Sequence, residues 1–267
     1  MTYSHFFRMI EINKVHQGEC LEIMKQIDDK SINLILCDLP YGVTARNKWD
    51  IIIPFEKMWQ QYKRIIKEDG AIILTATQPF ASRLVMSNIE MFKYEWIWEK
   101  PNGQGFLNAK KQPLRNHEQV LVFYNSQPTY NPQFTEGKPY TCKQGGHGIN
   151  YGERGKDVKE VITVNDGKRY PLTVQKIKYD GEKVHPTQKP IELFEYLIKT
   201  YSKEGDLVLD NCIGSGTTAI ACIRTKRNFI GIELSPEYCK LSEDRIQKEL
   251  MQTQLNTNGG EFFSSQP

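Results

Sequence analysis

The amino-acid sequence predicts an α/β fold with a mostly parallel, twisted sheet that is flanked by helices. Over the first 125 residues, apolar runs of strand length alternate with amphipathic helical stretches, which is the pattern of consecutive βαβ units. The same alternation returns between about residue 190 and residue 251. The chain of 267 residues, with 39% hydrophobic and 25% charged residues, is large enough for one such domain with an insertion.

The first part of the sheet is predicted from apolar runs and from the stop signals between them. The longest helical stretch begins at Pro54 and ends at Gly70, residues that are typical of a helix start and a helix end. Strands are expected near 10–15, 32–37, 71–76, 93–98 and 118–124, and helices at 20–27, 54–70 and 79–90.

The periodic pattern is lost between residues 125 and 184, which are rich in Gly, Pro, Tyr and Lys. This stretch is too long for a passive connection, so it is interpreted as an inserted functional region. Residues 1–124 and 185–252 would then form one catalytic domain, and residues 253–267 a disordered tail.

The positive charge is concentrated in the middle of the chain. Residues 100–190 contain 15 Lys and Arg against 8 Asp and Glu, a surplus that suits a polyanionic partner.

Order resumes after the insertion and completes the sheet. A helix is expected at 190–201, a strand at 206–210, a helix at 217–226, a strand at 228–233 and an amphipathic helix at 236–251.

Several classes of protein are disfavoured by the composition. The six cysteines are scattered without a C-x-x-C pair or a Cys/His cluster, so neither a metal site nor a disulfide framework is expected. No apolar run approaches the length of a membrane helix, and the N-terminus lacks the layout of a signal peptide. The sequence therefore predicts a cytoplasmic protein with no membrane partner.

A glycine loop between a strand and a helix predicts a nucleoside-containing cofactor. Residues 210–219, DNCIGSGTTA, fit G-x-G-x-x-A through Gly214, Gly216 and Ala219. The next strand ends at Glu233, where an acid can accept hydrogen bonds from ribose hydroxyls. The loop alone does not choose between a nicotinamide dinucleotide and S-adenosylmethionine, although nicotinamide enzymes usually place this motif in their first βαβ unit.

A second motif, DLPYG at residues 38–42, follows a buried strand. The exocyclic amine of a base is a poor nucleophile, and two acceptors aimed at its N–H groups would draw it toward a tetrahedral geometry. The Asp38 carboxylate and the Leu39 carbonyl are suitable acceptors, Pro40 fixes the backbone, and Tyr41 offers a flat face for an unstacked base. If the strand ending at Asp210 lies beside this strand, both motifs share one crevice.

These motifs resemble those of the DNA amino-methyltransferases that form N6-methyladenine or N4-methylcytosine. DLPYG comes first, VHPTQKP (184–190) and GSGTT come last, and the insertion lies between, which is similar to the order in the beta group of that family. The resemblance extends from about residue 10 to residue 251. It implies a Rossmann-like S-adenosylmethionine-dependent methyltransferase fold with an inserted target-recognition region, double-stranded DNA as the partner, no metal, and a homodimer.

The resemblance also implies roles for individual residues. The catalytic motif corresponds to Asp38, Leu39, Pro40 and Tyr41. The cofactor contacts correspond to Thr187, Gln188, Lys189, Asp210, Cys212, Gly214, Ser215, Gly216, Thr217 and Glu233, with a minor contact region at HQGEC (16–20). Three positions depart from the family's usual residues: Leu39 replaces a proline, Glu19 an aspartate and Cys212 a phenylalanine.

Contacts with DNA are expected from basic residues of the 95–124 segment and of the insertion. The candidates are Lys110, Lys111, Arg115, Lys138, Lys143, Arg154, Lys168 and Arg169. Trp96 and Trp98 share a strand face and are expected in the core, and His117 and His185 are interpreted as structural.

The preferred hypothesis is methylation of adenine N6 in duplex DNA after the base is flipped, because aspartate at the first motif position favours adenine in the family. Cytosine N4 is the alternative within the family. A nicotinamide-dependent oxidoreductase and a non-catalytic DNA-binding protein are the alternatives from other classes.

Overall fold

A computed structural model describes residues 10–42, 50–144, 161–179 and 188–259, which divide into two compact units. The first unit contains the described residues up to Asn131 and from Thr173 onward, and the second unit is Pro132–Leu172. The second unit lies inside the expected insertion at 125–184, whose two ends belong to the first unit. No helix of these described ranges is long and apolar enough to cross a membrane.

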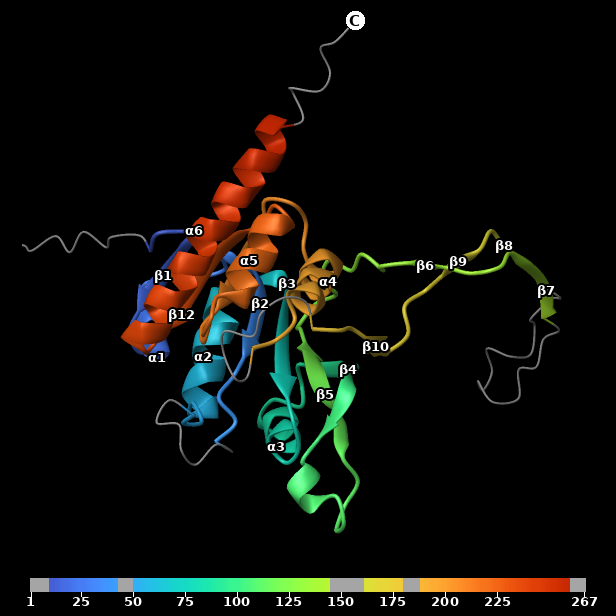
Figure 1. Ribbon diagram of the computed structural model, residues 1–267, viewed down its shortest axis with the longest axis horizontal. Helices are drawn as coiled ribbons and strands as arrows, with labels where there is room; N and C mark the ends of the chain where they lie inside the picture. Colours follow the sequence, from blue (N-terminus) through green and yellow to red (C-terminus); the bar gives the residue numbers. More distant parts are fainter. Residues whose placement is uncertain (1–9, 43–49, 145–160, 180–187, 260–267) are drawn as a thin grey trace, which may run out of the picture. The chain divides into compact units, whose positions relative to one another are not determined.

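The first unit is built on an eight-stranded sheet with the strand order β1-β12-β11-β2-β3-β5-β4-β10 (Figure 1). Its strands are β1 (Lys14–Gln17), β2 (Ile32–Asp38), β3 (Ile66–Ala76), β4 (Phe92–Gln104), β5 (Arg115–Phe123), β10 (Val174–Lys176), β11 (Leu207–Asp210) and β12 (Asn228–Glu233). Its helices are α1 (Cys20–Met24), α2 (Phe55–Ile65), α3 (Phe80–Ser87), the 3₁₀ turn η1 (Phe106–Asn108), α4 (Ile191–Tyr201), α5 (Thr217–Arg224) and α6 (Pro236–Gly259).

Strand pairing is parallel throughout this sheet except for the two pairs made by β5. β2 lies between β3, which follows it in the chain, and β11, which comes about 170 residues later. The strand order reverses between β2 and β11, so their carboxyl ends flank the crevice where ligands bind in open α/β sheets. The prediction that the strand ending at Asp210 lies beside the strand ending at Asp38 is confirmed.

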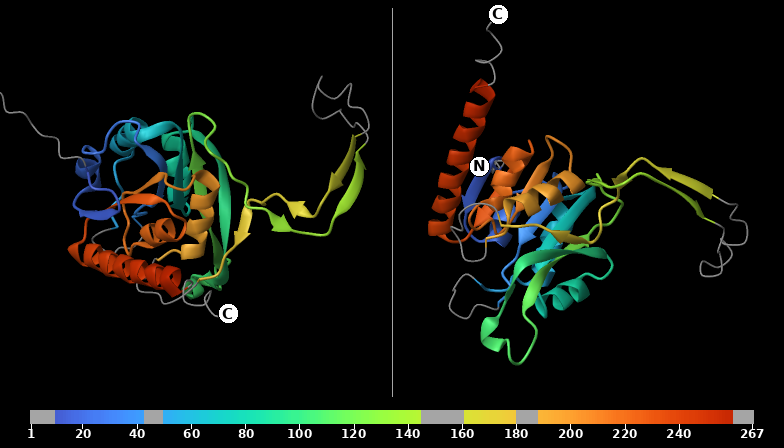
Figure 2. Two further views of the ribbon diagram at one scale, coloured as in Figure 1. Left: turned by 90° about the horizontal axis from the view of Figure 1, so that it is seen from above. Right: turned by 45° about the vertical axis from the view of Figure 1, so that its right-hand side comes forward.

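Helices cover both faces of the sheet and bury a separate hydrophobic core on each face (Figure 2). Alternate residues of β2 point to opposite sides: Leu34 and Leu36 meet α4, α5 and α6, whereas Ile35 and Cys37 meet α1, α2 and α3. The α/β prediction with a mostly parallel sheet is therefore confirmed. Trp96 and Trp98 are buried as expected.

Several element boundaries differ from the sequence expectation, for example the end of β4, which runs to Gln104 instead of residue 98. α2 ends at Ile65, and β3 already starts at Ile66, so that Gly70 lies inside the strand rather than at a helix end. A Cβ atom on Gly70 would lie 2.9 Å from the Asn33 carbonyl oxygen, so this glycine permits close approach of two strands. α6 continues to Gly259, past the end expected at Met251 and into the stretch that was interpreted as a disordered tail.

The second unit consists of two antiparallel pairs, β6 (Thr135–Glu136) with β9 (Lys168–Arg169) and β7 (Tyr140–Gln144) with β8 (Val161–Asn165). The rings of Phe134 and Tyr170 lie 4.9 Å apart, and the Arg169 guanidinium lies 4.8 Å from the centroid of the Tyr140 ring. Aromatic contacts therefore supply much of the packing in a unit with few buried residues.

We expect Tyr201→Phe to lower the free energy of unfolding by about 1–3 kcal/mol. The buried Tyr201 hydroxyl accepts a hydrogen bond from Trp96 Nε1 at 2.6 Å and lies 2.8 Å from the Tyr94 hydroxyl. Its removal leaves the buried indole N–H without an acceptor. Urea unfolding followed by tryptophan fluorescence measures the change, with the exposed Tyr170→Phe as the matched control. Equal stability of the two variants would contradict the expectation.

Candidate active site

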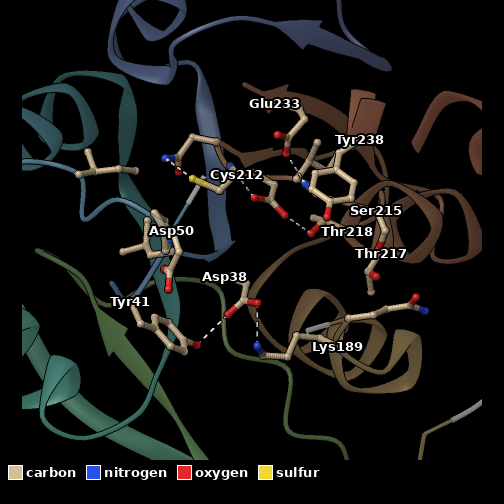
Figure 3. A pocket seen from close by; sticks show the side chains of 18 of the residues that line it. Asp38, Tyr41, Asp50, Lys189, Cys212, Ser215, Thr217, Thr218, Glu233 and Tyr238 are labelled. Atoms are coloured by element: carbon tan, nitrogen blue, oxygen red, sulfur yellow. Dashed lines mark hydrogen bonds and ion pairs between the residues drawn. The ribbon is translucent and has the colours of Figure 1, made fainter. Parts of the chain in front are cut away.

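A cavity of about 630 Å³ opens at the carboxyl ends of β2, β11 and β12 (Figure 3). The motif after β2 and the glycine loop after β11 both line it. Of the residues predicted from sequence, the cavity is lined by Asp38, Leu39, Pro40, Tyr41, Gln188, Lys189, Asp210, Cys212, Gly214, Ser215, Thr217 and Glu233. Residues from the two ends of the chain thus form one site.

The Asp38 carboxylate stands at the end of β2 and accepts hydrogen bonds on both oxygens. Oδ1 accepts from the Tyr41 hydroxyl at 2.7 Å and from the Thr75 hydroxyl at the corresponding end of β3. Oδ2 accepts from Lys189 Nζ at 2.6 Å, and Figure 3 shows this lysine reaching toward Asp38 across the cavity. The carboxylate is thereby held in one orientation at the cavity wall.

Lys189 belongs to a buried cluster of four charged side chains. Its ammonium lies 3.2 Å from Glu118 Oε2, and Glu118 Oε1 pairs with Lys100. Burial by itself lowers the pKa of Lys189, but the carboxylates of Asp38 and Glu118 outweigh it, so the pKa lies above its ordinary value. Burial is the larger influence on Lys100 and lowers its pKa. Two cations and two carboxylates give this cluster a net charge of zero.

The rest of the DLPYG motif is fixed by packing against α3. The Tyr41 ring lies 5.1 Å from the Phe80 ring, and burial, with the nearby Asp38 charge, raises the pKa of the Tyr41 hydroxyl. The Leu39 side chain is buried in the core beneath the sheet. Only the backbone of Leu39 is therefore available to a ligand, as the sequence argument required.

The glycine loop approaches its neighbours as closely as its sequence predicts. Gly214 and Gly216 have φ angles of 53° and 84°, a region that side chains other than glycine rarely adopt. A Cβ atom on Gly216 would lie 3.0 Å from the Ser242 Cβ of α6. At Gly214 the nearest atom to such a Cβ is the Cys212 carbonyl oxygen at 3.9 Å, so this side of the loop is open. Gly216 therefore permits close packing of the loop on α6, whereas Gly214 leaves its side of the loop open.

Glu233 at the end of β12 is the acid best placed to hold a ribose. Its Oε2 accepts from the Gly214 amide at 2.9 Å, and its Oε1 accepts from the Ser235 amide at 2.8 Å. Each carboxylate oxygen has a second lone pair, so both can still accept from ligand hydroxyls. Burial raises the pKa of Glu233, and the backbone amides partly offset that effect.

The minor contact region predicted at 16–20 lies beside this acid. The Gly18 amide donates to the Glu233 carbonyl oxygen at 2.9 Å, and Gly18, Glu19 and Cys20 line the cavity. Glu19 is the N-cap of α1 and accepts from the Glu22 amide at 2.9 Å. Its carboxylate thus has a structural role as well as a place at the cavity wall.

Asp210 lines the cavity but is almost fully buried at the end of β11, next to the glycine loop. It accepts hydrogen bonds from the Cys212 amide at 3.0 Å and from the Thr218 hydroxyl. Burial raises the pKa of Asp210 to about 7. Its hydrogen bonds shape the turn between β11 and α5, which makes it a support of the loop.

Several residues of the site carry no motif that reveals them in the sequence. Thr75 reaches Asp38, Glu118 reaches Lys189, and Lys100 reaches Glu118, in each case only after distant strands have paired. Other residues at the cavity that the sequence argument did not single out are Asp50, Ile51, Ile52, Ile53, Pro54, Gln104, Tyr179, Phe194 and Tyr238.

The residues predicted to contact DNA occupy three locations. Lys110 and Lys111 are exposed on the loop between β4 and β5, and Arg115 begins β5 at the cavity wall. Lys138, Lys143 and Lys168 are exposed on the second unit. Arg169 is tied to Asn165 and to the Lys138 carbonyl, so its guanidinium supports the fold of that unit. Thr187, Arg154 and His185 lie outside the described residues.

The chain matches the family model for DNA methylases of the N6/N4 methyltransferase type over residues 32–244. The type II methyltransferase M1.MboII of Moraxella bovis is 28% identical over 260 residues, which cover 86% of this chain and 95% of that protein. The type II methyltransferase M.HinfI of Haemophilus influenzae is 29% identical over 277 residues, which cover 89% of this chain and 69% of that protein.

Solved structures share the fold. The M1.HpyAVI–SAM complex aligns with a TM-score of 0.58 at 23% identity and covers 87% of this chain and 98% of that chain. The cytosine-N4-specific PvuII DNA methyltransferase aligns with a TM-score of 0.61 at 16% identity. That alignment covers 88% of this chain and 90% of the PvuII enzyme.

We expect Asp210→Asn to flatten the dependence of stability on pH between about 4 and 7. The folded chain keeps the Asp210 proton up to about pH 7, whereas an unperturbed carboxyl releases it near 3.8. The folded state binds more protons in this window, so the free energy of unfolding of the wild type falls as the pH rises through it. Urea unfolding across the window measures the slope, with the exposed Asp166→Asn as control. The same slope in wild type and Asp210→Asn would contradict the expectation.

Proposed function

The chain belongs to the N6/N4 family of DNA methylases, and on that premise we propose that it methylates adenine N6 in duplex DNA, with S-adenosylmethionine as the methyl donor. The observation that carries the proposal is the single cavity shared by Asp38, Gly214 and Glu233. The proposed acceptor for the target amine and the proposed binding loop for the cofactor line the same cavity.

The residues of the cavity fit S-adenosylmethionine. A volume of about 630 Å³ lies within the range of small-molecule sites. Glu233 has oxygen lone pairs left for ribose hydroxyls, and Gly214 leaves its side of the loop open. Gly18, Glu19 and Cys20 line the same part of the cavity and would contact the adenine. When bound, this group supplies a methyl on a positively charged sulfonium sulfur.

The DLPYG motif would position the target amine. Asp38 and the Leu39 carbonyl would accept hydrogen bonds from its two N–H groups, which orients the nitrogen lone pair toward the methyl donor. The Tyr41 ring lines the cavity and offers a stacking surface for a flipped base. Because the Lys189 ammonium has a raised pKa, it stays charged and does not serve as a base. The surplus proton would leave through Asp38 or water.

Adenine is proposed over cytosine because an aspartate stands first in the motif. The alternative is cytosine N4, the target named for the PvuII enzyme that shares the fold. Digestion of methylated DNA to nucleosides followed by mass spectrometry separates the two products. N6-methyladenine is the expected product, and N4-methylcytosine alone would exclude adenine.

The loop between β4 and β5 is proposed as a DNA-contacting element. β4 ends at Gln104 and β5 begins at Arg115, and both residues line the cavity, so the loop starts at its rim. Residues 100–117 contain four cations and no acid. At the tip, Phe106 and Leu107 are 73% and 101% exposed, two adjacent apolar side chains that a duplex could cover.

The second unit is proposed to recognise the target sequence, with Lys138, Lys143 and Lys168 as phosphate contacts. Arg154, which lies outside the described residues, is also proposed to contact DNA.

We also propose a homodimer, which sedimentation of the free protein would test.

We expect Asp38→Asn to reduce kcat about 100-fold or more while the affinity for S-adenosylhomocysteine changes little. The variant keeps the size of the side chain but replaces one acceptor oxygen by a donor nitrogen. Incorporation of labelled methyl groups and isothermal titration measure the two quantities. Undiminished methylation by Asp38→Asn would refute the catalytic assignment. DNA binding by the wild type without any methylation would favour a non-catalytic DNA-binding protein.

We expect the double variant Phe106→Ser/Leu107→Ser to lose about tenfold in methylation of a matched duplex. An apolar tip that helps to unstack the target base is dispensable when that base is already unpaired. Methylation of a duplex with a mismatch opposite the target should therefore be close to wild type. Met86→Ser/Ile89→Ser, which alters two exposed apolar side chains away from the cavity, is the control. Equal loss on matched and mismatched DNA would contradict this role.

A further inference from the structure

The acceptor proposed for the target amine already accepts hydrogen bonds from other side chains of the protein. Asp38 Oδ1 accepts from two hydroxyls, and Oδ2 accepts from the Lys189 ammonium. A cation bound to a carboxylate draws electron density from it and weakens it as an acceptor for a neutral amine. Lys189 therefore competes with the substrate for Asp38.

Glu118 provides a second position for the same ammonium. Its Oε2 is buried and forms an ion pair with Lys189 Nζ at 3.2 Å, but this contact lacks the geometry of a hydrogen bond. A buried carboxylate oxygen gains from a well-aligned hydrogen bond, so a closer approach of Lys189 would stabilise it. A small movement of Nζ away from Asp38 would form that bond.

The surroundings allow this movement without a change in protonation. Lys189 stays cationic because both carboxylates raise its pKa, and Lys100 holds the other oxygen of Glu118. The Tyr41 ring, whose centroid lies 5.6 Å from Lys189 Nζ, gives the ammonium an attractive aromatic neighbour. The cluster remains neutral whichever carboxylate Lys189 binds.

We propose that Lys189 is a positioning residue that moves between two carboxylates: Asp38 holds it while the site lacks a target base, and Glu118 takes it when the target amine donates to Asp38. The sequence resemblance gave Lys189 a cofactor contact and gave Glu118 no role. The inference rests on the proposed function of Asp38, and it adds Glu118 as the residue that releases the acceptor.

Glu118→Gln tests the proposal because it keeps the shape of the side chain and removes its charge. Lys189 then stays on Asp38, so kcat should fall about tenfold or more while the affinities for S-adenosylhomocysteine and DNA stay within about twofold. Glu99→Gln is the matched control, since Glu99 lies on the same hairpin, pairs with the exposed Lys176 and does not line the cavity.

A second substitution separates this role from a merely structural one. Lys189→Met in the Glu118→Gln background removes the competing cation and restores the charge balance between Asp38 and Lys100. The double variant should regain about tenfold in kcat over Glu118→Gln. A double variant no faster than Glu118→Gln, or a Glu118→Gln enzyme as fast as Glu99→Gln, would overturn the proposal. Either result leaves the role of Asp38 intact, which Asp38→Asn tests separately.

A crystal structure of the wild type with S-adenosylhomocysteine and target DNA gives a direct readout. Lys189 Nζ should lie closer to Glu118 Oε2 than 3.2 Å and farther from Asp38 Oδ2 than 2.6 Å, the two distances in the present structure. A complex in which the target amine and Lys189 both contact Asp38 at hydrogen-bond distance would also overturn the proposal.

Discussion

The parallel pairing of β11 with β2 is the contact on which the site depends. Val208 pairs with Leu34 and Leu209 with Ile35, which joins two strands about 170 residues apart. Asn33 reinforces the junction, because its Oδ1 accepts from the Leu207 amide and from Lys67 Nζ, each at 3.1 Å. One side chain thus links β2 to both of its neighbours. The strand order reverses here, so the catalytic motif and the glycine loop open into the same cavity.

Much of this architecture could be predicted because local sequence and tertiary structure agree. The apolar runs of β2, β11 and β12 gave the positions of these strands correctly, and the motif at each strand end showed where the crevice would lie. Prediction failed where tertiary pairing overrides local preference. Residues 66–70, IKEDG, resemble a helix end by their charges, but they extend β3 because Ile66 pairs with Ile32. β10 was missed because three residues between loops carry no period.

The site, like the fold, could be predicted only where local sequence carries the information. Residues inside motifs, such as Asp38, Gly214 and Glu233, were found because their chemistry and spacing identify them. Glu118, the second partner of Lys189, was not found, since it meets Lys189 only after β5 pairs with β4. Sequence motifs thus indicated which side chains line the cavity, whereas the charged groups around them are determined by the packing of distant elements.

The buried cluster is difficult to explain by stability alone. Charged side chains lose their hydration when buried, and replacing such a cluster by apolar groups of similar volume is often neutral or stabilising. Glu118 Oε2 adds to the cost, because it is left without a hydrogen bond among the described residues. The four charges do place one cation between two carboxylates, which apolar residues could not do. Lys189 Nζ lies 2.6 Å from Asp38 and 3.2 Å from Glu118, so the proposed transfer between them needs only a short movement of the ammonium.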